Sequence, residues 1–425
     1  MIGTLKKLFR NRTFYVLLAM MLFFLPMTLY MPSQAQSRAI VTAIGIDRTE
    51  DNLYEITLAM ITPKNGGQVA GGNMVDSGTG DTVSIAMQML QINLGRIIGL
   101  QHCSFIIISD KVFEEDVTKV LDYFIRTNNL TADAHIINCP KSAKELISEG
   151  ASASATSIAT MNDIVQFNNE YLYSEAITIY EFYNRYYSQA NSVFVPILEL
   201  KGEENIQDKN ESSSSDSSSS DVGSSNSESS NSGAGGSQNT ANSSKLTSNG
   251  KCAIVKNGVK IREISENERL ALNIVNSGDG NSVIGVKGYT EYPIEDADIY
   301  FQLFDKASKI DGYFEGDKPI IKFKIRIIVK LDEVVTNNNN VEASSSITSF
   351  MTPRLEEKLA ENIESYVFEL VDNMKRDNTD ILFVYDHLNR FHHKKFSRYL
   401  DSLDNAENYL QGIDFKCDIE IRSKI

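Results

Sequence analysis

The residues of this chain that could carry chemistry begin with a turn of aspartic-protease type. Asp76-Ser77-Gly78 supplies one suitable carboxylate, but that chemistry needs two carboxylates close enough to share a proton. The sequence has no second such turn, so only a homodimer would bring two together. We favour the interpretation that these residues precede the start of a helix. Asp81 or Thr82 follows the glycines, and such side chains accept hydrogen bonds from the free amides of a first helical turn.

Histidines and cysteines are the next candidates, as metal ligands. His102 lies beside Cys103, and His392-His393 form a pair, but a metal site needs three or four donors at set spacings. The sequence shows no such set, so we predict no metal and no cofactor. We expect His102 to end a strand with its ring hydrogen-bonded, and the region from His393 to Lys395 to be a solvated basic face.

Motifs of other enzyme classes are missing from the sequence. Gly66-Gly67 and Gly71-Gly72 are not followed by the Lys-Ser/Thr of a phosphate-binding loop. Neither a Gly-x-Ser-x-Gly elbow nor a Cys-x-x-Cys pair is present. The four cysteines are widely separated and are interpreted as free thiols, with Cys103 and Cys139 the pair to expect if one bridge forms. Residue types alone therefore indicate binding or assembly.

The overall charge restricts the partners of the chain. A net charge of -15 and a pI near 4.9 argue against nucleic acid, which requires a basic stripe, and disfavour an anionic membrane surface. Residues 1–36 have the pattern of a targeting segment, with basic residues before the apolar run Phe14–Tyr30 and small residues at Ser33–Ala35. The segment is either a cleaved signal peptide or a retained membrane anchor, and in both cases the remainder lies outside the cytoplasm.

Composition also divides the chain into parts. Residues 202–248 are rich in Ser and Asn and cannot bury enough apolar surface to order themselves, which predicts a disordered linker. It separates an N-terminal α/β domain, 38–201, from a C-terminal α+β domain, 249–425. We expect the two domains to separate freely.

Periodicity in the N-terminal part predicts strands that alternate with helices, a mixed α+β arrangement. Ile40, Ile44 and Ile46 are expected on one face of the first strand and Val41 on the other, with both faces covered. A mobile loop is expected over Gln68–Gly80. The predicted strands are Ala39–Asp47, Tyr54–Ile61, Ser104–Ser109 and Ala134–Asn138, and the predicted helices are Val83–Leu94, Val112–Ile125, Ser142–Ser148, Ala155–Asn168 and Ser174–Tyr187.

The C-terminal part opens with a predicted hairpin, Cys252–Lys256 and Val259–Arg262, turned by Asn257-Gly258 in a type I′ conformation. Ile320–Leu331 alternates apolar and basic residues, which predicts a half-exposed strand. A long helix with one apolar stripe should begin at Pro353 and lie across the sheet of that strand. Phe415–Ile421 alternates again and predicts the last strand.

The opening strand carries a family resemblance. Ala39–Asp47 reads A-I-V-T-A-I-G-I-D and resembles the A-x-V-x-A-I-G-I-D of the mature C-subunit family of bacterial spore germinant receptors. The resemblance continues in register, with Thr379–Leu382 in the place of an Asp-Ile-Leu strand. Further matching stretches are Gly78–Val83, His102–Ile108, Leu121–Arg126, Ala132–His135, Ile179–Tyr183, Val193–Ile197 and Cys252–Lys256.

Six residues become family-motif or interface candidates through this resemblance: Gly45, Asp47, Gly80, Thr82, His102 and Arg126. Arg126 has two interpretations, as a complement to the negative end of its helix and as a contact with a partner subunit. The chain departs from the family in having no lipobox, since its first cysteine is Cys103, and no tryptophan. It is identified as a divergent member.

The resemblance implies a three-domain α+β fold and a role. Family members are non-enzymatic extracytoplasmic subunits that work beside integral membrane subunits in the spore inner membrane and serve the response to nutrients. Two alternatives remain open from the residues alone. One is a free-standing secreted binding or adhesion module, and the other is an enzyme acting on cell-wall material.

Overall fold

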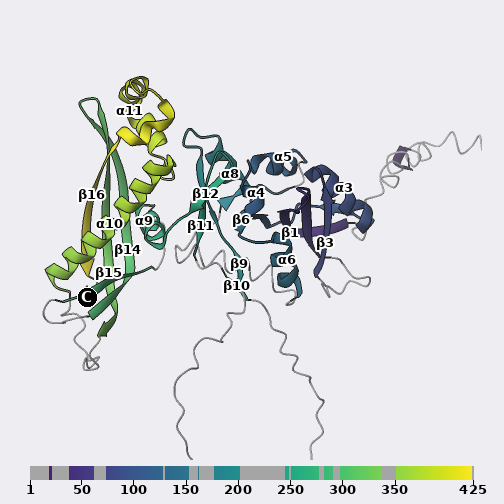
Figure 1. The fold of residues 1–425 in the computed structure, drawn as a ribbon, viewed down its shortest axis with the longest axis horizontal. Helices are drawn as coiled ribbons and strands as arrows, with labels where there is room; N and C mark the ends of the chain where they lie inside the picture. The colour runs from purple at the N-terminus through teal and green to yellow at the C-terminus, as the bar shows by residue number, and fades with distance from the viewer. Residues whose placement is uncertain are drawn as a thin grey trace, which may run out of the picture.

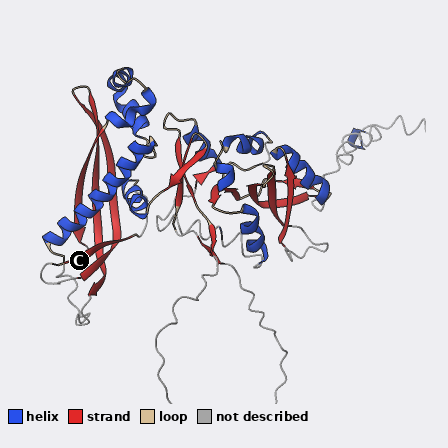
Figure 2. Ribbon diagram, viewed as in Figure 1, coloured by secondary structure: helices blue, strands red, loops and turns tan. Residues whose placement is uncertain are grey.

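The described residues form three larger sheets that follow one another along the molecule, and a two-stranded pair lies beside the middle one (Figure 1). The computed structural model describes residues 19–21, 38–61, 73–127, 130–152, 161, 177–201, 245–247, 250–276, 282–290, 297–336 and 351–423. Helices cover the seven-stranded N-terminal sheet and one face of the four-stranded C-terminal sheet, with a three-stranded sheet between them (Figure 2). The mixed α+β fold is therefore confirmed. The predicted segment 1–36 and linker 202–248 lie largely outside the described residues.

The N-terminal sheet has the order β3-β2-β1-β5-β6-β7, with β4 paired to β1. The predicted opening hairpin is confirmed, and Asn52 in its turn has a positive φ of 61°. Its strands are β1 (Arg38–Arg48), β2 (Tyr54–Ile61), β3 (Asn73–Gly80), β4 (Ile97–Gly99), β5 (Phe105–Ser109), β6 (His135–Cys139) and β7 (Ile177–Thr178).

A bulge in β1 overturns the expected assignment of its faces. The register with β2 skips Thr42, whose hydroxyl donates to the Ala59 carbonyl at 3.1 Å. Because a bulge adds one residue to the alternation, Val41 shares a core with Ile44 and Ile46, while Ile40 does not. The expectation that both faces are covered is confirmed, since Ala43 belongs to a separate apolar cluster.

The loop expected before the first helix is wrong over residues 73–80, which form β3 and pair with β2 along their whole length. Residues 68–72 lie outside the described residues. β3 has glycines at positions 78 and 80 instead of alternating apolar residues, because a Cβ on either would come within 2.7 Å of the backbone of the helix that covers the strand. Glycines in a strand can therefore indicate a closely packed helix, a signal that a search for apolar periodicity does not detect.

The helices of this part are α3 (Val83–Leu94), α4 (Asp110–Phe113), α5 (Thr118–Arg126), α6 (Ala143–Ser152) and α8 (Ile179–Tyr186). The single helix expected over Val112–Ile125 is wrong, because Asp116 accepts from the Thr118 amide at 3.0 Å and the Val117 amide donates to the Gly258 carbonyl. The Val117 and Thr118 amides therefore do not form the hydrogen bonds that a continuous helix would need. The helix expected over Ala155–Asn168 lies outside the described residues except for position 161.

The central sheet has the order β12-β11-β8 and takes strands from both sides of the segment 202–248. It contains β8 (Ser192–Pro196), β11 (Cys252–Lys256) and β12 (Val259–Glu263), and beside it β9 (Glu199–Lys201) pairs with β10 (Lys245–Thr247). The predicted hairpin is confirmed, with φ of 51° at Asn257 and 80° at Gly258. The expectation that the flanking parts separate freely is wrong, because β8 and β11 are hydrogen-bonded. The domain boundaries themselves stay a prediction.

Both faces of this central sheet are buried in different cores. Val193, Val195 and Val255 belong to the core of the N-terminal part, whereas Phe194 and Ile254 belong to the core of the C-terminal part. Alternation along β8 and β11 therefore sends successive side chains into two different cores. The sheet is a layer shared by both ends of the molecule.

The C-terminal sheet runs β13-β14-β15-β16, with β16 parallel to β15. Its strands are β13 (Val283–Tyr289), β14 (Ala297–Glu315), β15 (Lys318–Thr336) and β16 (Asp414–Ser423), and its helices are α9 (Glu266–Val275), α10 (Pro353–Asp377), α11 (Val384–Asp401) and the 3-10 turn η3 (Ala406–Gly412). The predicted helix at Pro353 is confirmed, capped by Thr352, and it lies across the sheet (Figure 1). The predicted strands over 320–331 and 415–421 are also confirmed.

The strand expected at Thr379–Leu382 is wrong, because these residues form the turn between α10 and α11. The buried carboxylate of Asp380 accepts from the Val384 and Tyr385 amides at 2.9 and 2.8 Å and from the Tyr409 hydroxyl at 2.6 Å. These bonds satisfy the first amides of α11. Asp380 and the apolar residues that follow it therefore form the buried, capped start of a helix rather than a strand.

Two histidines of α11 hold the tip of the β14–β15 hairpin. The Gly312 amide donates to Nε2 of His387 at 3.0 Å, and Nε2 of His392 lies 2.7 Å from the Gly312 carbonyl, to which it donates. A Cβ at Gly312 would come within 2.9 Å of the His387 ring. The basic face expected for His393 is exposed as predicted, but its neighbour His392 is half-buried and turned to the sheet.

This contact predicts a pH dependence at the hairpin tip. Burial lowers the pKa of His387, an effect that His392 and Lys309 reinforce and Asp311 opposes. As pH falls, His387 is protonated in the unfolded chain at a higher pH than in the folded protein, so its contribution to stability is full above about pH 6.5. The bond from the Gly312 amide to His387 is then lost as the pH drops through the pKa of His387 in the folded protein. Hydrogen exchange of the Gly312 amide, corrected for intrinsic rate, should accelerate on acidification.

The matched variants for this prediction are His387→Gln and His393→Gln. The side-chain oxygen of the introduced glutamine can accept the same amide without titrating, so acidification should leave Gly312 exchange almost unchanged in His387→Gln. His393 is exposed and its Nδ1 lies 2.7 Å from Asn389 Oδ1 on its own helix, so its variant should behave as wild type. A wild-type response in both variants would contradict the assignment.

The pairing of β9 with β10 predicts the effect of removing residues 210–244. Lys201 lies opposite Lys245, so the two ends of the segment are already held side by side. A shorter connection should lower the entropy of closure and raise the free energy of unfolding by about 1 kcal/mol. Denaturant unfolding of the deletion variant measures this, and loss of cooperative unfolding would show that the segment contributes to the fold.

Candidate functional site

Gly45 and Asp47 dock helix α6 on β1. The buried Asp47 carboxylate accepts from the Ala143 and Lys144 amides at 2.9 and 2.8 Å, which are free amides at the helix start. A Cβ at Gly45 would come within 2.8 Å of Ile147, so glycine is needed for this close approach. Burial raises the pKa of Asp47, and the two backbone bonds oppose the rise.

Gly80 and Thr82 do the same for helix α3. Thr82 is the N-cap residue and its hydroxyl accepts from the Ile85 amide at 3.3 Å, as the sequence predicts. A Cβ at Gly80 would lie 2.7 Å from the Ala86 amide nitrogen. Helices α3 and α6 contribute to different apolar clusters, so these two docking points do not meet.

The other two candidates are exposed. His102 lies in the turn before β5, so the expectation that it ends a strand is wrong, and its ring is exposed. Arg126 ends α5 and pairs with Asp122 one turn earlier, at 2.6 Å. Arg126 is thereby bonded to Asp122, which lines a groove, whereas His102 stays a candidate with no contact that defines a role.

That groove lies between α5 and α8 and has a volume of about 470 Å³. Tyr180 and Tyr187 line it and are largely exposed, while Tyr183 is half-buried and donates to the Thr118 carbonyl at 3.4 Å. Apolar contact comes from Ile125 and Ile179. Phenol rings on an apolar floor are typical of protein interfaces.

A second cluster fixes the central sheet to the N-terminal sheet. Lys260 of β12 donates to both oxygens of Asp110, at 2.8 and 3.0 Å, and to Asn138 Oδ1 at 3.2 Å. Asn138 in turn donates to Asp110 at 2.8 Å. The three residues come from β12, the start of α4 directly after β5, and β6, so one largely buried ammonium group holds two sheets together.

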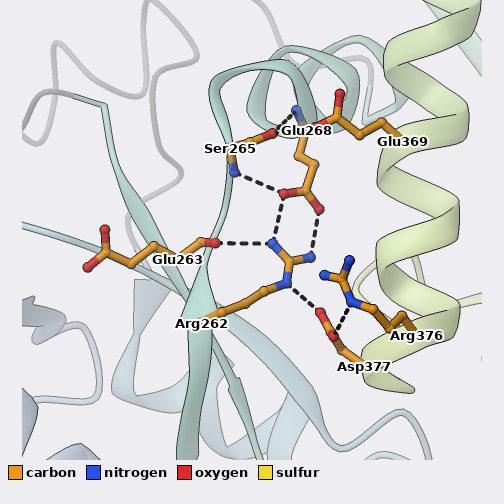
Figure 3. Close-up of polar contacts among 7 residues, drawn as sticks. All are labelled: Arg262, Glu263, Ser265, Glu268, Glu369, Arg376 and Asp377. Carbon is orange, nitrogen blue, oxygen red and sulfur yellow. Dashed lines mark hydrogen bonds and ion pairs between the residues drawn. The ribbon is translucent and has the colours of Figure 1, made fainter.

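A third cluster, drawn in Figure 3, fixes the central sheet to the C-terminal part. Arg262 of β12 makes two parallel bonds to Glu268, at 2.6 and 2.7 Å, and its Nε donates to Asp377 at the end of α10. Only 1% of the Glu268 side chain is exposed. The Arg262 guanidinium therefore joins β12, α9 and α10 through paired, charge-assisted bonds.

The surroundings keep the Glu268 carboxyl ionised in spite of its burial. Burial alone would raise its pKa, but bonds from the Arg262 guanidinium and the Ser265 amide outweigh that effect and hold the pKa of Glu268 below its ordinary value. Ser265 caps α9 and also donates to Glu369 of α10 at 3.0 Å (Figure 3). The helix cap and the ion pair are thus one connected network.

A bulge in β12 explains why two nearby basic residues serve opposite ends of the molecule. Arg262 lies opposite Ile254 and Lys260 opposite Val255, so the pairing skips Ile261. Because Ile254 and Val255 face different cores, Arg262 and Lys260 also point to different sides.

Sequence reasoning missed both residues. The Ser265-x-x-Glu268 capping box was a usable signal for the start of α9, although it does not reveal the partner Arg.

Neither metal binding nor thiol chemistry has support in the part of the chain that the structure describes. No group of three or more His, Cys, Asp or Glu side chains there could hold a metal ion. The four cysteines are free, and burial raises the pKa of Cys103, Cys139 and Cys417 to about 12. Such thiols are protonated at neutral pH and unreactive.

The geometry defines a multi-domain α+β scaffold with a shared central sheet. Lys260 and Arg262 of that sheet form ion pairs with the N-terminal and C-terminal parts, respectively. A family described as the spore germination protein N-terminal domain matches residues 33–200. A second, described as spore germination B3/GerAC like, C-terminal, matches residues 250–424. Together they account for most of the chain, which therefore belongs to the GerAC-like family of germinant-receptor C-subunits.

Individual relatives agree with this assignment. Spore germination protein KC of Bacillus subtilis (strain 168) is 30% identical over 118 residues, which cover 26% of this chain and 29% of that protein. The match thus spans less than a third of the relative's length. The crystal structure of the GerBC protein superimposes with a TM-score of 0.50 at 16% identity, covering 90% of this chain and 97% of that chain. At this identity the likeness shows the fold.

The Arg262 cluster predicts a large and specific loss of stability. Arg262→Ala leaves the Glu268 carboxylate buried without its partner and should lower the free energy of unfolding by about 3 kcal/mol. Arg262→Lys keeps the charge but not the two parallel bonds, so it should recover only part of the loss. Urea unfolding followed by tyrosine fluorescence measures both.

Arg376→Ala is the matched control, because Arg376 also bonds to Asp377, at 3.1 Å, but 63% of its side chain is exposed. Exposed pairs contribute less than about 1 kcal/mol. Equal losses in Arg262→Ala and Arg376→Ala would contradict a special role for the buried pair.

Proposed function

We propose that this protein is a non-enzymatic subunit of a germinant receptor, held at the extracytoplasmic face of a membrane and assembled with integral membrane subunits for nutrient-triggered germination. The observation that carries the proposal is the order of the two family matches, 33–200 and 250–424, which together follow the chain from its first strand to its last. Among the described residues no helix is long and apolar enough to cross a membrane. Membrane contact in this proposal comes from segment 1–36 and from the partners.

The described residues support an assembly role through their chemistry. The polar clusters around Lys260 and Arg262 pair opposite charges between structural elements. In spite of burial, bonds from Arg262 hold the pKa of Glu268 and of Asp377 below their ordinary values, which suits ion pairing rather than proton transfer to a substrate. The cell-wall enzyme has no comparable support, since neither cluster lines the α5–α8 groove or the pocket beside Lys256 and Tyr409.

Surfaces suited to protein partners are present at the N-terminal end. The α5–α8 groove offers exposed tyrosines beside the Arg126–Asp122 pair. Tyrosine and arginine are enriched at protein interfaces because they combine large contact area with polar groups. Arg126 is accordingly proposed as an interface residue.

Affinity purification tests the proposal. The tagged full-length protein is isolated from detergent-solubilised membranes of its sporulating host, and the co-purifying proteins are identified by mass spectrometry. We expect two multi-span membrane proteins in amounts comparable to the tagged chain. Recovery of the chain alone, or only from the medium, would overturn the proposal and favour a free-standing secreted module.

A further inference from the structure

The first helix of the N-terminal part, α3, is apolar on two faces. Its inner face packs into the core through Val83, Ala86, Met87 and Leu90. Its outer face carries Ile85, Met89 and Ile92, which are 39%, 47% and 65% exposed. No residue between 83 and 94 is charged. A surface helix ordinarily has a charged outer face, whereas α3 exposes these three apolar side chains beside the uncharged Ser84, Gln88, Gln91 and Asn93, a composition that suits a covered surface.

The three exposed side chains form one stripe. Positions 85, 89 and 92 are four and three residues apart, a spacing that places them one above another on the same side of a helix. Ile97 on β4, 55% exposed, follows three residues after the helix ends and extends the apolar character at that end. We call Ile85, Met89, Ile92 and Ile97 the α3 stripe.

The stripe lies where the chain comes from its predicted membrane segment. Ile97 of β4 is the register partner of Arg38, the first residue of β1, in a parallel pair. Segment 1–36 immediately precedes this strand. Helix α3 is at the end of the molecule opposite the C-terminal sheet (Figure 1). If segment 1–36 is a retained anchor, the stripe is kept close to the membrane surface.

The chemistry of the stripe fits a helix of a protein partner better than a lipid surface. Helices that lie in a bilayer interface use Lys and Arg on their polar face and aromatic residues on the other, and residues 83–94 contain none of these. The net charge of -15 also opposes an anionic lipid surface. A narrow stripe at four- and three-residue spacing is the form in which one helix packs against another.

We propose that the α3 stripe docks an uncharged, apolar helix of an integral membrane subunit at the membrane surface. This inference rests on the proposed function and names the surface that performs it. Thr82, which caps α3, and the glycines of β3, on which α3 packs, position the helix, while the stripe makes the contact. Removing its apolar surface should weaken assembly without unfolding the protein.

The test uses full-length tagged protein in host membranes. The variant Ile85→Gln/Met89→Gln/Ile92→Gln should reduce co-purification of multi-span proteins by about tenfold or more. The matched control is Val283→Gln/Val335→Gln/Phe391→Gln, which alters side chains that are 48%, 45% and 61% exposed in the C-terminal part. The control should retain wild-type co-purification, and circular dichroism should show both variants folded.

Photo-crosslinking identifies what covers the stripe. A benzoylphenylalanine at position 89 should crosslink to one of the co-purifying multi-span proteins, and one at position 391 should not. Crosslinks at position 89 to lipid only, or to a second copy of this chain, would overturn the inference. So would wild-type co-purification by the triple stripe variant, a result that leaves the proposed function standing. Absence of any multi-span partner from the wild-type purification would overturn the proposed function itself.

Discussion

Strands β8 and β11 of the central sheet are buried on both faces, and this constraint connects the two ends of the molecule. Alternate residues of β8 and β11 enter different cores, so neither core is complete without the sheet. Apolar burial of this kind has no direction of its own. The orientation of the two ends is set by the charged groups of β12, with Lys260 bonded to one side and Arg262 to the other. The bulge at Ile261 is the feature that separates them.

This arrangement changes how the family-motif residues are understood. Gly45 with Asp47, and Gly80 with Thr82, are positions where a helix approaches a strand closely and has its first amides satisfied. They bring α6 and α3 to their places on the sheet. The surfaces that we propose for partner contact, the α3 stripe and the tyrosine groove, lie on the outward sides of α3, α5 and α8. Four of the six family-motif residues therefore position helices, whereas Arg126 belongs both to the family motif and to the proposed interface.

Buried polar groups in this protein follow one rule at several sites. Asp47 of β1 accepts the first amides of α6, and Asp380 accepts those of α11, which follows it directly. Glu268 accepts the Ser265 amide at the start of its own helix, α9, and also pairs with Arg262. A buried carboxylate is costly unless bonds replace its water, and helix starts offer amides in the required place. Buried carboxylates, which in other proteins can act as catalytic acids, accept hydrogen bonds here from the amides at helix starts.

The sequence by itself determined the elements whose signals are local. The opening hairpin, α3 with its Thr82 cap, the Asn257-Gly258 turn, the long helix at Pro353 and the last strand all depend on residues within a few positions of one another. The family, and through it the fold, also followed from a continuous pattern in β1. What local signals could not show was the bulge at Thr42, the strand β3 with its glycines, or the burial of Asp380 beside Tyr409, because each depends on a neighbouring element. Tertiary structure alone decided that Arg262 meets Asp377, 115 residues away, and that the central sheet belongs to two cores. Such contacts form only when distant segments are packed, and no spacing along the chain records them.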